Sequence, residues 1–332
     1  MRRLAVLAVL TFSIPIAISL SLSVGVMKAN PISAFLVLLG QEDDPITQAV
    51  VWGIRLPRTL MALIAGSALA LAGAALQGAL RNPLVSPFTL GVSSGASFGA
   101  ALAIVLGIGF VGAGPYLIMI NAFIFALVAS AVAMAIAKLK GMTPESVILA
   151  GIAMMYLFSA LVTILQYIAG EHQLRALVYW LMGDLALANW RRVVLASLAL
   201  IAYIPLLKYA WDLNALIMGE EVAKSLGTEP GRTRLICAML SSLVVAIVVC
   251  ATGPIGFICL VSPHIARLLL GADYRFSMIG SALIGALLLT LSDTVARVVI
   301  APAELPVGVV TSLIGVPFFI HLFIRSRRRT WL

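Results

Sequence analysis

Charged side chains are scarce in this chain. Lys, Arg, Asp and Glu make up 11% of its 332 residues, and 62% of the residues are hydrophobic. Soluble globular proteins contain roughly 25% charged residues, and so few charges could not cover the surface of a water-soluble fold of this length. The composition therefore excludes a soluble globular protein and indicates one that lies in a membrane.

Cysteine and histidine are also rare. Cys237, Cys250 and Cys259 lie in apolar segments at spacings that match no zinc motif, and an odd number of cysteines argues against a disulfide framework. We expect them to be packing residues. The histidines are scattered along the chain. The sequence thus predicts no metal site, and it assembles neither the metal ligands nor the nucleophile and base that an intramembrane enzyme would need.

A phosphate-binding loop is missing as well. The stretch from Gly219 to Ser225 superficially resembles one, but it lacks the glycine before the lysine. We therefore expect no cofactor to be bound by this chain.

Long apolar runs dominate the sequence. Stretches of about 17–25 residues, which cross a bilayer as a helix, occur at ten places, and Gly, Ser or Pro interrupt the third and eighth. The runs are continuous rather than alternating, which favours helices over a β-barrel. We predict an all-α, polytopic membrane protein with a single transmembrane domain over residues 1–332. The expected spans are 4–26, 59–80, 88–110, 115–138, 145–168, 190–208, 233–252, 254–270, 277–300 and 306–324.

Lys and Arg are distributed unevenly between the two sides of these spans. The first run is too long for a signal peptide and no small-residue cleavage site follows it, so we expect an uncleaved first helix. With the N-terminus inside, 15 of the 22 basic residues lie on the inner side. The positive-inside rule therefore places both termini in the cytoplasm, and the net charge of +9 implies no nucleic acid. We expect the chain to lie in the cytoplasmic membrane. The outer basic residues are Lys28, Arg55, Arg58, Arg175, Arg191, Arg192 and Arg297. The inner ones are Arg2, Arg3, Arg81, Lys138, Lys140, Lys208, Lys224, Arg232, Arg234, Arg267, Arg275, Arg325, Arg327, Arg328 and Arg329.

Acidic residues within the spans are nearly absent. Asp293 alone lies well inside one, and Arg297 follows it by one helical turn on the same face. A locally paired Asp is more typical of structure than of a proton relay. The pattern therefore speaks against an ion-driven secondary carrier, which remains the alternative within transport.

The longest polar interruption in the second half of the chain covers about residues 211–230. It predicts a short charged helix between Gly219 and Gly227, with Gly227 as a left-handed residue at the helix end. Such a helix in a cytoplasmic loop suits contact with a soluble partner. The alternative interpretation is a solvated loop with no partner.

Elsewhere, Gly91, Gly95 and Gly99 recur at intervals of four residues, which favours close helix packing over a direct transport role.

Three stretches carry a family resemblance. The first is Arg55-Leu56-Pro57-Arg58-Thr59, and the second is Arg81-Asn82-Pro83-Leu84-Val85-Ser86-Pro87 with Leu90-Gly91-Val92-Ser93-Ser94-Gly95-Ala96. The third comprises Gly253-Pro254-Ile255-Gly256-Phe257, Pro263-His264-Ile265-Ala266-Arg267, Asp293-Thr294-Val295-Ala296-Arg297 and Glu304-Leu305-Pro306-Val307-Gly308. From about Arg55 to Arg325, the chain closely resembles the permease subunits of the FecCD family, which belong to type II ABC importers for iron-siderophores, haem and vitamin B12.

The resemblance implies the partners and the roles of particular residues. Two permease copies with ten helices each would form a pore, above two cytoplasmic ATPases that bind ATP and Mg, and an extracytoplasmic substrate-binding protein would deliver the cargo. Glu171–Arg175 followed by Tyr179 and Trp180 resembles a short helix between the fifth and sixth spans. The expected cargo is an iron(III)-siderophore, haem or cobalamin, with molybdate or tungstate as the alternative. The implied site residues are Glu220, Glu221, Lys224, Ser225, Leu226 and Gly227 for ATPase coupling, Asn82, Pro83, Leu84 and Thr143 for a cytoplasmic gate, and Arg55, Arg58 and Arg297 for docking of the binding protein. These three arginines could instead anchor the chain near lipid headgroups.

Overall fold

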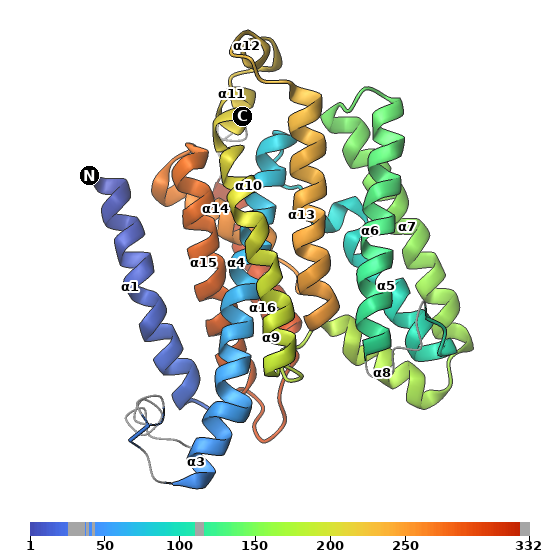
Figure 1. Ribbon diagram of the computed structural model, residues 1–332, viewed down its shortest axis with the longest axis vertical. Coiled ribbons are helices and arrows are strands. Elements are labelled where there is room, and N and C mark those ends of the chain that lie inside the picture. The colour runs from blue at the N-terminus through green and yellow to red at the C-terminus, as the bar shows by residue number, and fades with distance from the viewer. Residues whose placement is uncertain (26–36, 38–39, 42–43, 110–115, 326–332) are drawn as a thin grey trace.

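The described part of the chain is a bundle of helices. The computed structural model describes residues 1–25, 37, 40–41, 44–109 and 116–325, and these contain no strand (Figure 1). Lys28 and Arg327–Arg329, which were assigned to the two sides of the membrane, lie outside these residues, as do the predicted span boundaries at 26, 110 and 115.

Seven helical segments are long and apolar enough to cross a membrane. Two of them consist of consecutive sub-elements, and the other five are single helices. They are α1 (Arg2–Ser23), α3–η1–α4 (Pro45–Val50, Val51–Arg55, Leu56–Ala79), α6 (Leu117–Leu139), α7 (Pro144–Ile168), α9–η5–α10 (Trp190–Ser197, Leu198–Ala202, Tyr203–Lys208), α13 (Pro230–Thr252) and α15 (Tyr274–Ala296).

Shorter apolar helices occupy the three remaining predicted spans. They are α5–η3 (Val92–Ala101, Leu102–Leu106), α14 (Ile258–Leu270) and α16 (Val307–Arg325). The third and eighth predicted spans, which Gly, Ser or Pro interrupt, correspond to short helices. The 13 residues of α14 extend only about 20 Å, which is less than the roughly 30 Å of a hydrocarbon core. The remaining elements are η2 (Pro87–Leu90), α8 (Glu171–Met182), α11 (Ala210–Ile217) and α12 (Glu220–Ser225).

Three predicted boundaries were clearly wrong. The second span was expected to begin at residue 59, but its helical segment begins at Pro45. The eighth span was expected to begin at residue 254, but Gly253 and Phe257 have left-handed φ values of 70° and 66°, so the chain stays non-helical until Ile258. Such backbone is tolerated at membrane depth where protein surrounds it, and Ile255 is fully buried. The ninth span ends at Ala296 rather than residue 300.

Helix α4 lies at the centre of the bundle, beside α13 and α15 (Figure 1). Its buried residues are largely Ala and Gly, so neighbouring backbones approach closely. A Cβ added at Gly66 would overlap the carbonyl of Gly285 in α15, and one added at Gly285 would overlap the carbonyl of Gly66. Gly95 and Gly99 of α5 meet backbone carbonyls of α6 in the same manner, which confirms the prediction of close packing.

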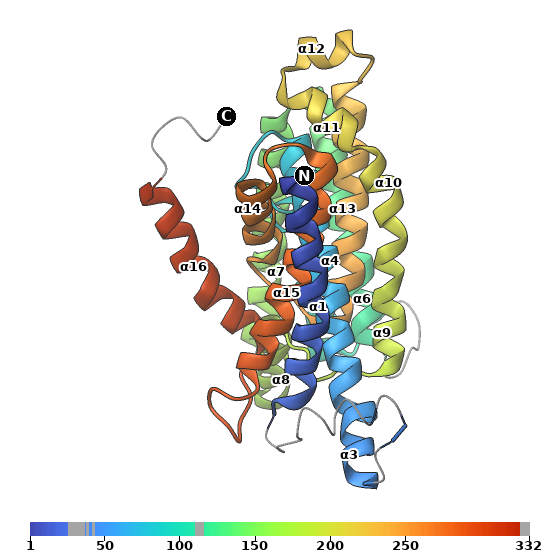
Figure 2. The same cartoon turned by 90° about the vertical axis from the view of Figure 1, so that its left-hand side faces the viewer.

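The bundle has two distinct ends. Helix α12 projects beyond its neighbours at one end, and α3 lies at the opposite end (Figures 1 and 2). The start of α1 and the last turn of α16 both lie toward the α12 end (Figure 2). The positive-inside rule predicts that the α12 end faces the cytoplasm.

Candidate functional site

The loop at the α12 end contains the short helix that the sequence predicted. Helix α12 follows Gly219, whose φ is 116°, and Gly227 has a φ of 86°. The N–H of Gly227 donates to the carbonyl of Lys224 at 3.0 Å, and the N–H of Thr228 donates to that of Ala223 at 2.9 Å. These two bonds form a Schellman motif, which satisfies carbonyls at the end of the helix. The left-handed conformation predicted for Gly227 is confirmed.

Most of the predicted coupling residues face outward. Ala223 is fully buried, and Thr228 donates its hydroxyl to Asp212 of α11 at 2.9 Å, which fixes the loop to the bundle. Val222 and Leu226, one turn apart, are 41% and 64% exposed. The exposed residues of α12 and its C-terminal end are Glu221, Val222, Lys224, Ser225, Leu226 and Gly227.

Glu220 faces inward instead. Its carboxylate forms an ion pair with Arg234 of α13. The hydrogen bond from Arg234, followed by the nearby charges of Arg234, Arg81 and Lys224, holds the pKa of Glu220 below its ordinary value. Glu220 therefore attaches α12 to the bundle.

Substitution at Gly227 should disturb α12 without disturbing the membrane-spanning helices. A left-handed conformation costs an ordinary L-residue about 1–2 kcal/mol, and a β-branched side chain is especially poor there. We expect Gly227→Val to lower transport while the protein remains in the membrane. Gly227→Asn should stay close to wild type because Asn tolerates this conformation. The matched control is Gly231→Ala, where a Cβ would make only an ordinary contact of 3.7 Å with Met142. Normal transport by Gly227→Val would show that the geometry of α12 is not required.

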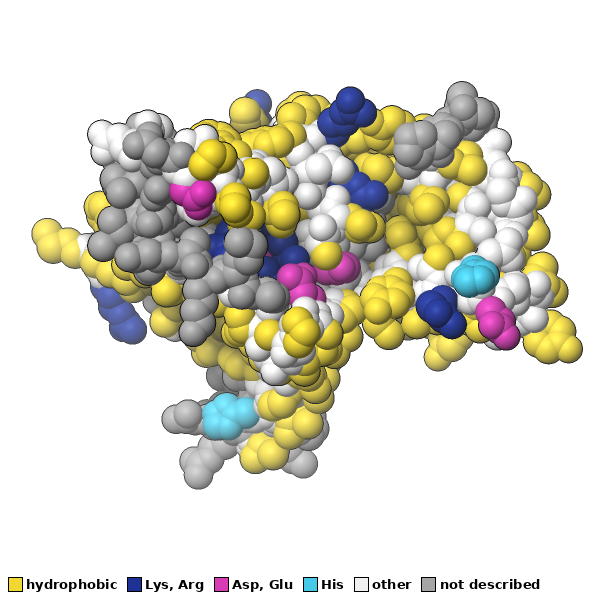
Figure 3. All heavy atoms as spheres, turned by 90° about the horizontal axis from the view of Figure 1, so that it is seen from below, with side chains coloured by type: hydrophobic (Ala, Val, Ile, Leu, Met, Phe, Trp, Pro, Cys, Tyr) yellow, Lys and Arg dark blue, Asp and Glu magenta, His cyan; other side chains and the backbone are white. Residues whose placement is uncertain are grey.

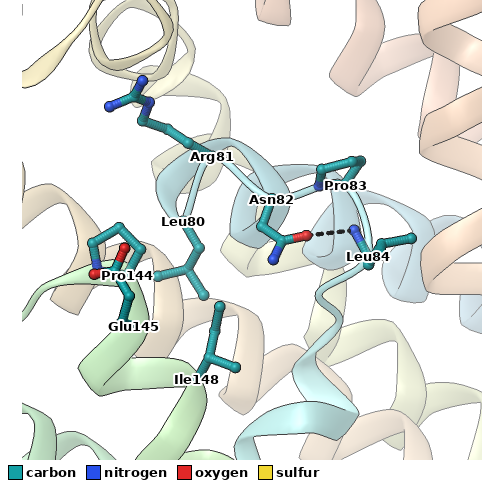
Figure 4. Close-up of a pocket in the computed structure, with 8 residues that line it drawn as sticks. All are labelled: Leu80, Arg81, Asn82, Pro83, Leu84, Pro144, Glu145 and Ile148. Atoms are coloured by element: carbon teal, nitrogen blue, oxygen red, sulfur yellow. Dashed lines mark hydrogen bonds between the residues drawn. The ribbon is translucent and has the colours of Figure 1, made fainter. Parts of the chain in front are cut away.

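The predicted gate segments lie around one hollow at the same end of the molecule. A cavity of about 550 Å³ is lined from two sides, by the α4–η2 connection and by the start of α7 (Figure 4). Leu80 and Ile148 point toward one another across it, whereas Arg81 points away. The N–H of Leu84 donates to the side-chain oxygen of Asn82 at 2.9 Å. The lining residues are Leu80, Arg81, Asn82, Pro83, Leu84, Pro144, Glu145 and Ile148.

Both segments begin with a defined reversal of the chain. At the end of α4, the N–H of Asn82 donates to the carbonyl of Gln77, and the N–H of Arg81 donates to the carbonyl of Gly78. Arg81 itself has a φ of 49° and therefore occupies the left-handed position of a Schellman motif, which is usually held by Gly. In the other segment Met142 has a φ of 55°. Thr143 does not line the cavity but caps α7, since its hydroxyl accepts the N–H of Ser146 at 3.2 Å.

The three arginines predicted to dock a partner are not on the surface. Arg55, Arg58 and Arg297 are only 5%, 4% and 4% exposed. Arg58 Nε lies 2.9 Å from Asp293 Oδ1, and Arg58 Nη1 lies 2.6 Å from Glu304 Oε2. Arg297 Nε lies 3.2 Å from Asp293 Oδ2, which confirms the predicted local pair.

Two of these arginines, Arg55 and Arg297, bind the end of α1. Arg55 donates to the carbonyls of Leu22 and Ser23, and Arg297 donates to the carbonyl and hydroxyl of Ser21. Buried cations require partners within the protein and are favourable at a helix C-terminus. Docking of a partner through these three side chains would require them to be exposed, whereas they are buried among groups of the same chain. The α3 end instead presents mostly hydrophobic and uncharged side chains among its described residues (Figure 3).

Sequence reasoning missed two features. Arg234 was counted only as a cytoplasmic charge, although it lies one turn inside α13 and directly before the apolar part of that helix. The second is an apolar groove of about 540 Å³ between α8, the α13–α14 connection and α16. None of its lining residues is charged; they are Leu181, Met182, Pro254, Gly256, Gly308, Val309, Ser312, Leu313, Val316 and Pro317.

Within the described residues, no three His, Cys, Asp or Glu side chains come together to hold a metal ion.

Comparison with known proteins gives consistent matches. The model of the FecCD transport family matches residues 13–325. An ABC transporter permease protein of Methanocaldococcus jannaschii is 45% identical over 93% of this chain and 91% of its own length. The hemin transport system permease protein of Yersinia pestis is 40% identical over 84% of each chain. A solved structure of an inward-facing metal-chelate type ABC transporter covers 97% of this chain and 99% of its own, with a TM-score of 0.86 and 36% identity.

The relatives differ in the cargo that their names give. A molybdate import system permease of Haemophilus influenzae is 37% identical over 86% of this chain and 84% of its own length. A vitamin B12 import system permease of Salmonella paratyphi A is 40% identical over 84% of each chain. Similarity of this degree therefore does not distinguish permeases named for metal chelates from those named for oxyanions.

Proposed function

The chain belongs to the FecCD transport family, and we propose that it forms the pore of a homodimeric importer driven by two cytoplasmic ABC ATPases. It is a multi-pass membrane protein and the permease subunit of an ABC importer, a transport component rather than an enzyme. ATP and Mg would be bound by the ATPase. An extracytoplasmic binding protein would deliver the cargo at the α3 end, and the protein would reside in the cytoplasmic membrane.

The geometry of α12 is the observation that carries this proposal. The helix projects from the bundle, is fixed on its inner side by Ala223 and Glu220, and exposes Val222 and Leu226 beside charged residues. An apolar pair rimmed by charges suits a protein partner better than water or lipid. ATP-driven movement of that partner would then displace α12.

A gate at Asn82–Leu84 follows from the same proposal. This connection and the start of α7 surround the hollow at the α12 end, where a pore would open to the cytoplasm. Pro83 lacks a backbone donor and has a fixed φ, so the connection can narrow a passage without becoming a continuous helix. Thr143 would contribute indirectly, by holding the start of α7.

For the cargo, we propose a metal chelate such as an iron(III)-siderophore, haem or cobalamin. The support comes from the groove beside α16, whose lining is uncharged and mostly apolar. Such a wall suits a large ligand whose metal charge is enclosed, whereas a bare oxyanion would require dedicated hydrogen-bond donors. Molybdate or tungstate is the alternative, because a relative of similar identity is named for molybdate.

Retention of the ATPase tests the role of α12. Affinity-tagged permease isolated from membranes that contain its ABC ATPase should carry that subunit in stoichiometric amount, together with ATP hydrolysis. The double variant Val222→Asp, Leu226→Asp should retain about tenfold less ATPase, because a charge in the centre of an interface is left desolvated. Leu139→Asp, a single apolar-to-aspartate substitution at another exposed residue of the same end, should retain it fully. Equal retention by all three proteins would refute the assignment.

A further inference from the structure

Arg234 links α12 to both predicted gate segments through one guanidinium group. Its side chain is 3% exposed. Nε donates to the carbonyl of Ala79 at 3.2 Å, Nη1 donates to that of Met142 at 3.1 Å, and Nη2 donates to the carboxylate of Glu220. Three segments that are far apart in sequence therefore share a single buried cation.

The two carbonyls lie where the gate segments leave their helices. Ala79 is the last residue of α4, three positions before Asn82, and Met142 immediately precedes Thr143. Both segments reverse through non-glycine residues with left-handed φ values, Arg81 at 49° and Met142 at 55°. A cation is favourable at a helix C-terminus, and it satisfies carbonyl groups that the reversals leave without a helical partner.

The third hydrogen bond of Arg234 reaches Glu220 in α12, the helix that would contact the ATPase. Glu220 lies in the first turn of α12, and its side chain is 40% exposed, whereas the guanidinium beside it is buried. Arg234 itself is held by α13, which packs against α4 and α6. A displacement of α12 therefore acts directly on the group that holds the ends of both gate segments.

From this geometry we infer that Arg234 is a positioning residue that transmits movement of α12 to the cytoplasmic gate. The inference rests on the proposed function, because it requires an ATPase that moves α12. Arginine suits the role because its planar group offers several donors in fixed directions. Lysine presents all its donors from one nitrogen and would not reproduce the three directions.

The test follows the gate and ATP hydrolysis separately in the permease–ATPase complex. The substitution Leu84→Cys introduces an exposed thiol at the gate, and the native cysteines are buried. Its rate of reaction with a water-soluble maleimide is measured with and without ATP and Mg. In a protein with Arg234 intact, the rate should depend on nucleotide. In Arg234→Met the complex should still assemble and hydrolyse ATP, but the labelling rate should no longer respond, and uptake per folded complex should fall about tenfold, within the usual range for coupling between sites.

Two further variants keep the test decisive. Arg234→Lys should fall between wild type and Arg234→Met. If Arg234→Met does not fold, Glu220→Ala takes its place. This substitution removes only the bond between Arg234 and α12, and it should give the same loss of nucleotide-dependent labelling. Nucleotide-dependent labelling that persists in the folded variants, with only a lower melting temperature, would overturn the inference and leave Arg234 a structural residue. Absence of any response with Arg234 intact would instead count against the proposed function.

Discussion

Replacing Asp293 with alanine is expected to remove most of the folded protein from the membrane. Asp293 is fully buried and neutralises both Arg58 and Arg297. Removing one partner of a buried ion pair costs about 3–5 kcal/mol, because the remaining charge is left without compensation. Two guanidinium groups would be affected here, and that of Arg297 also helps to hold the end of α1. The measurement is the yield of monodisperse protein and its melting temperature in detergent.

Glu304 provides the matched control for this prediction. It pairs with the same Arg58, but its side chain is 36% exposed, so water can replace part of the lost interaction. Glu304→Gln should therefore lower the melting temperature much less than Asp293→Ala. Replacing Asp293, Arg58 and Arg297 together with apolar residues should recover part of the yield, since the unpaired charges are then gone. An Asp293→Ala protein as abundant and as stable as wild type would contradict the described cluster.

A valine at Gly66 is expected to separate the two helices at the centre of the bundle. The backbones of α4 and α15 meet at Gly66 and Gly285, where an added Cβ has no room. Overpacking that shifts the backbone typically costs about 1–3 kcal/mol and occasionally more. Reduced yield and a lower melting temperature would report the separation.

The control is Gly53→Val, at a position where an added Cβ would meet nothing within 4 Å. This variant should express and melt like wild type. If Gly66→Val behaved in the same way, the close crossing of α4 and α15 would be wrong.

Much of the fold could be predicted because lipid imposes simple rules. Backbone groups that face lipid must be satisfied within their own helix, so long apolar runs become spans. Breaks in those runs mark the short helices, as Gly253 does before α14. Gly227 could be predicted to be left-handed because a glycine after a short charged helix usually ends it.

The sites were less predictable because partners distant in sequence decide them. The positive-inside rule counts a basic residue by its side of the membrane and cannot tell an exposed arginine from one paired with a carboxylate. Arg58 finds Asp293 and Glu304 more than 230 residues away, so its burial could not be read from its neighbours in sequence. The same holds for Arg234, whose carbonyl partners belong to two other connections.

The most direct test is a measurement of whether uptake is driven by ATP or by an ion gradient. The permease, its ATPase and its binding protein are reconstituted into vesicles with the binding-protein side outward. Accumulation of a labelled iron(III) chelate, haemin, cobalamin and molybdate is then measured. We expect one of these cargoes to accumulate only when ATP and Mg reach the ATPase, and accumulation should be unchanged when ionophores dissipate the ion gradients. Accumulation that continues without ATP and stops with an ionophore would identify an ion-driven carrier and contradict the account.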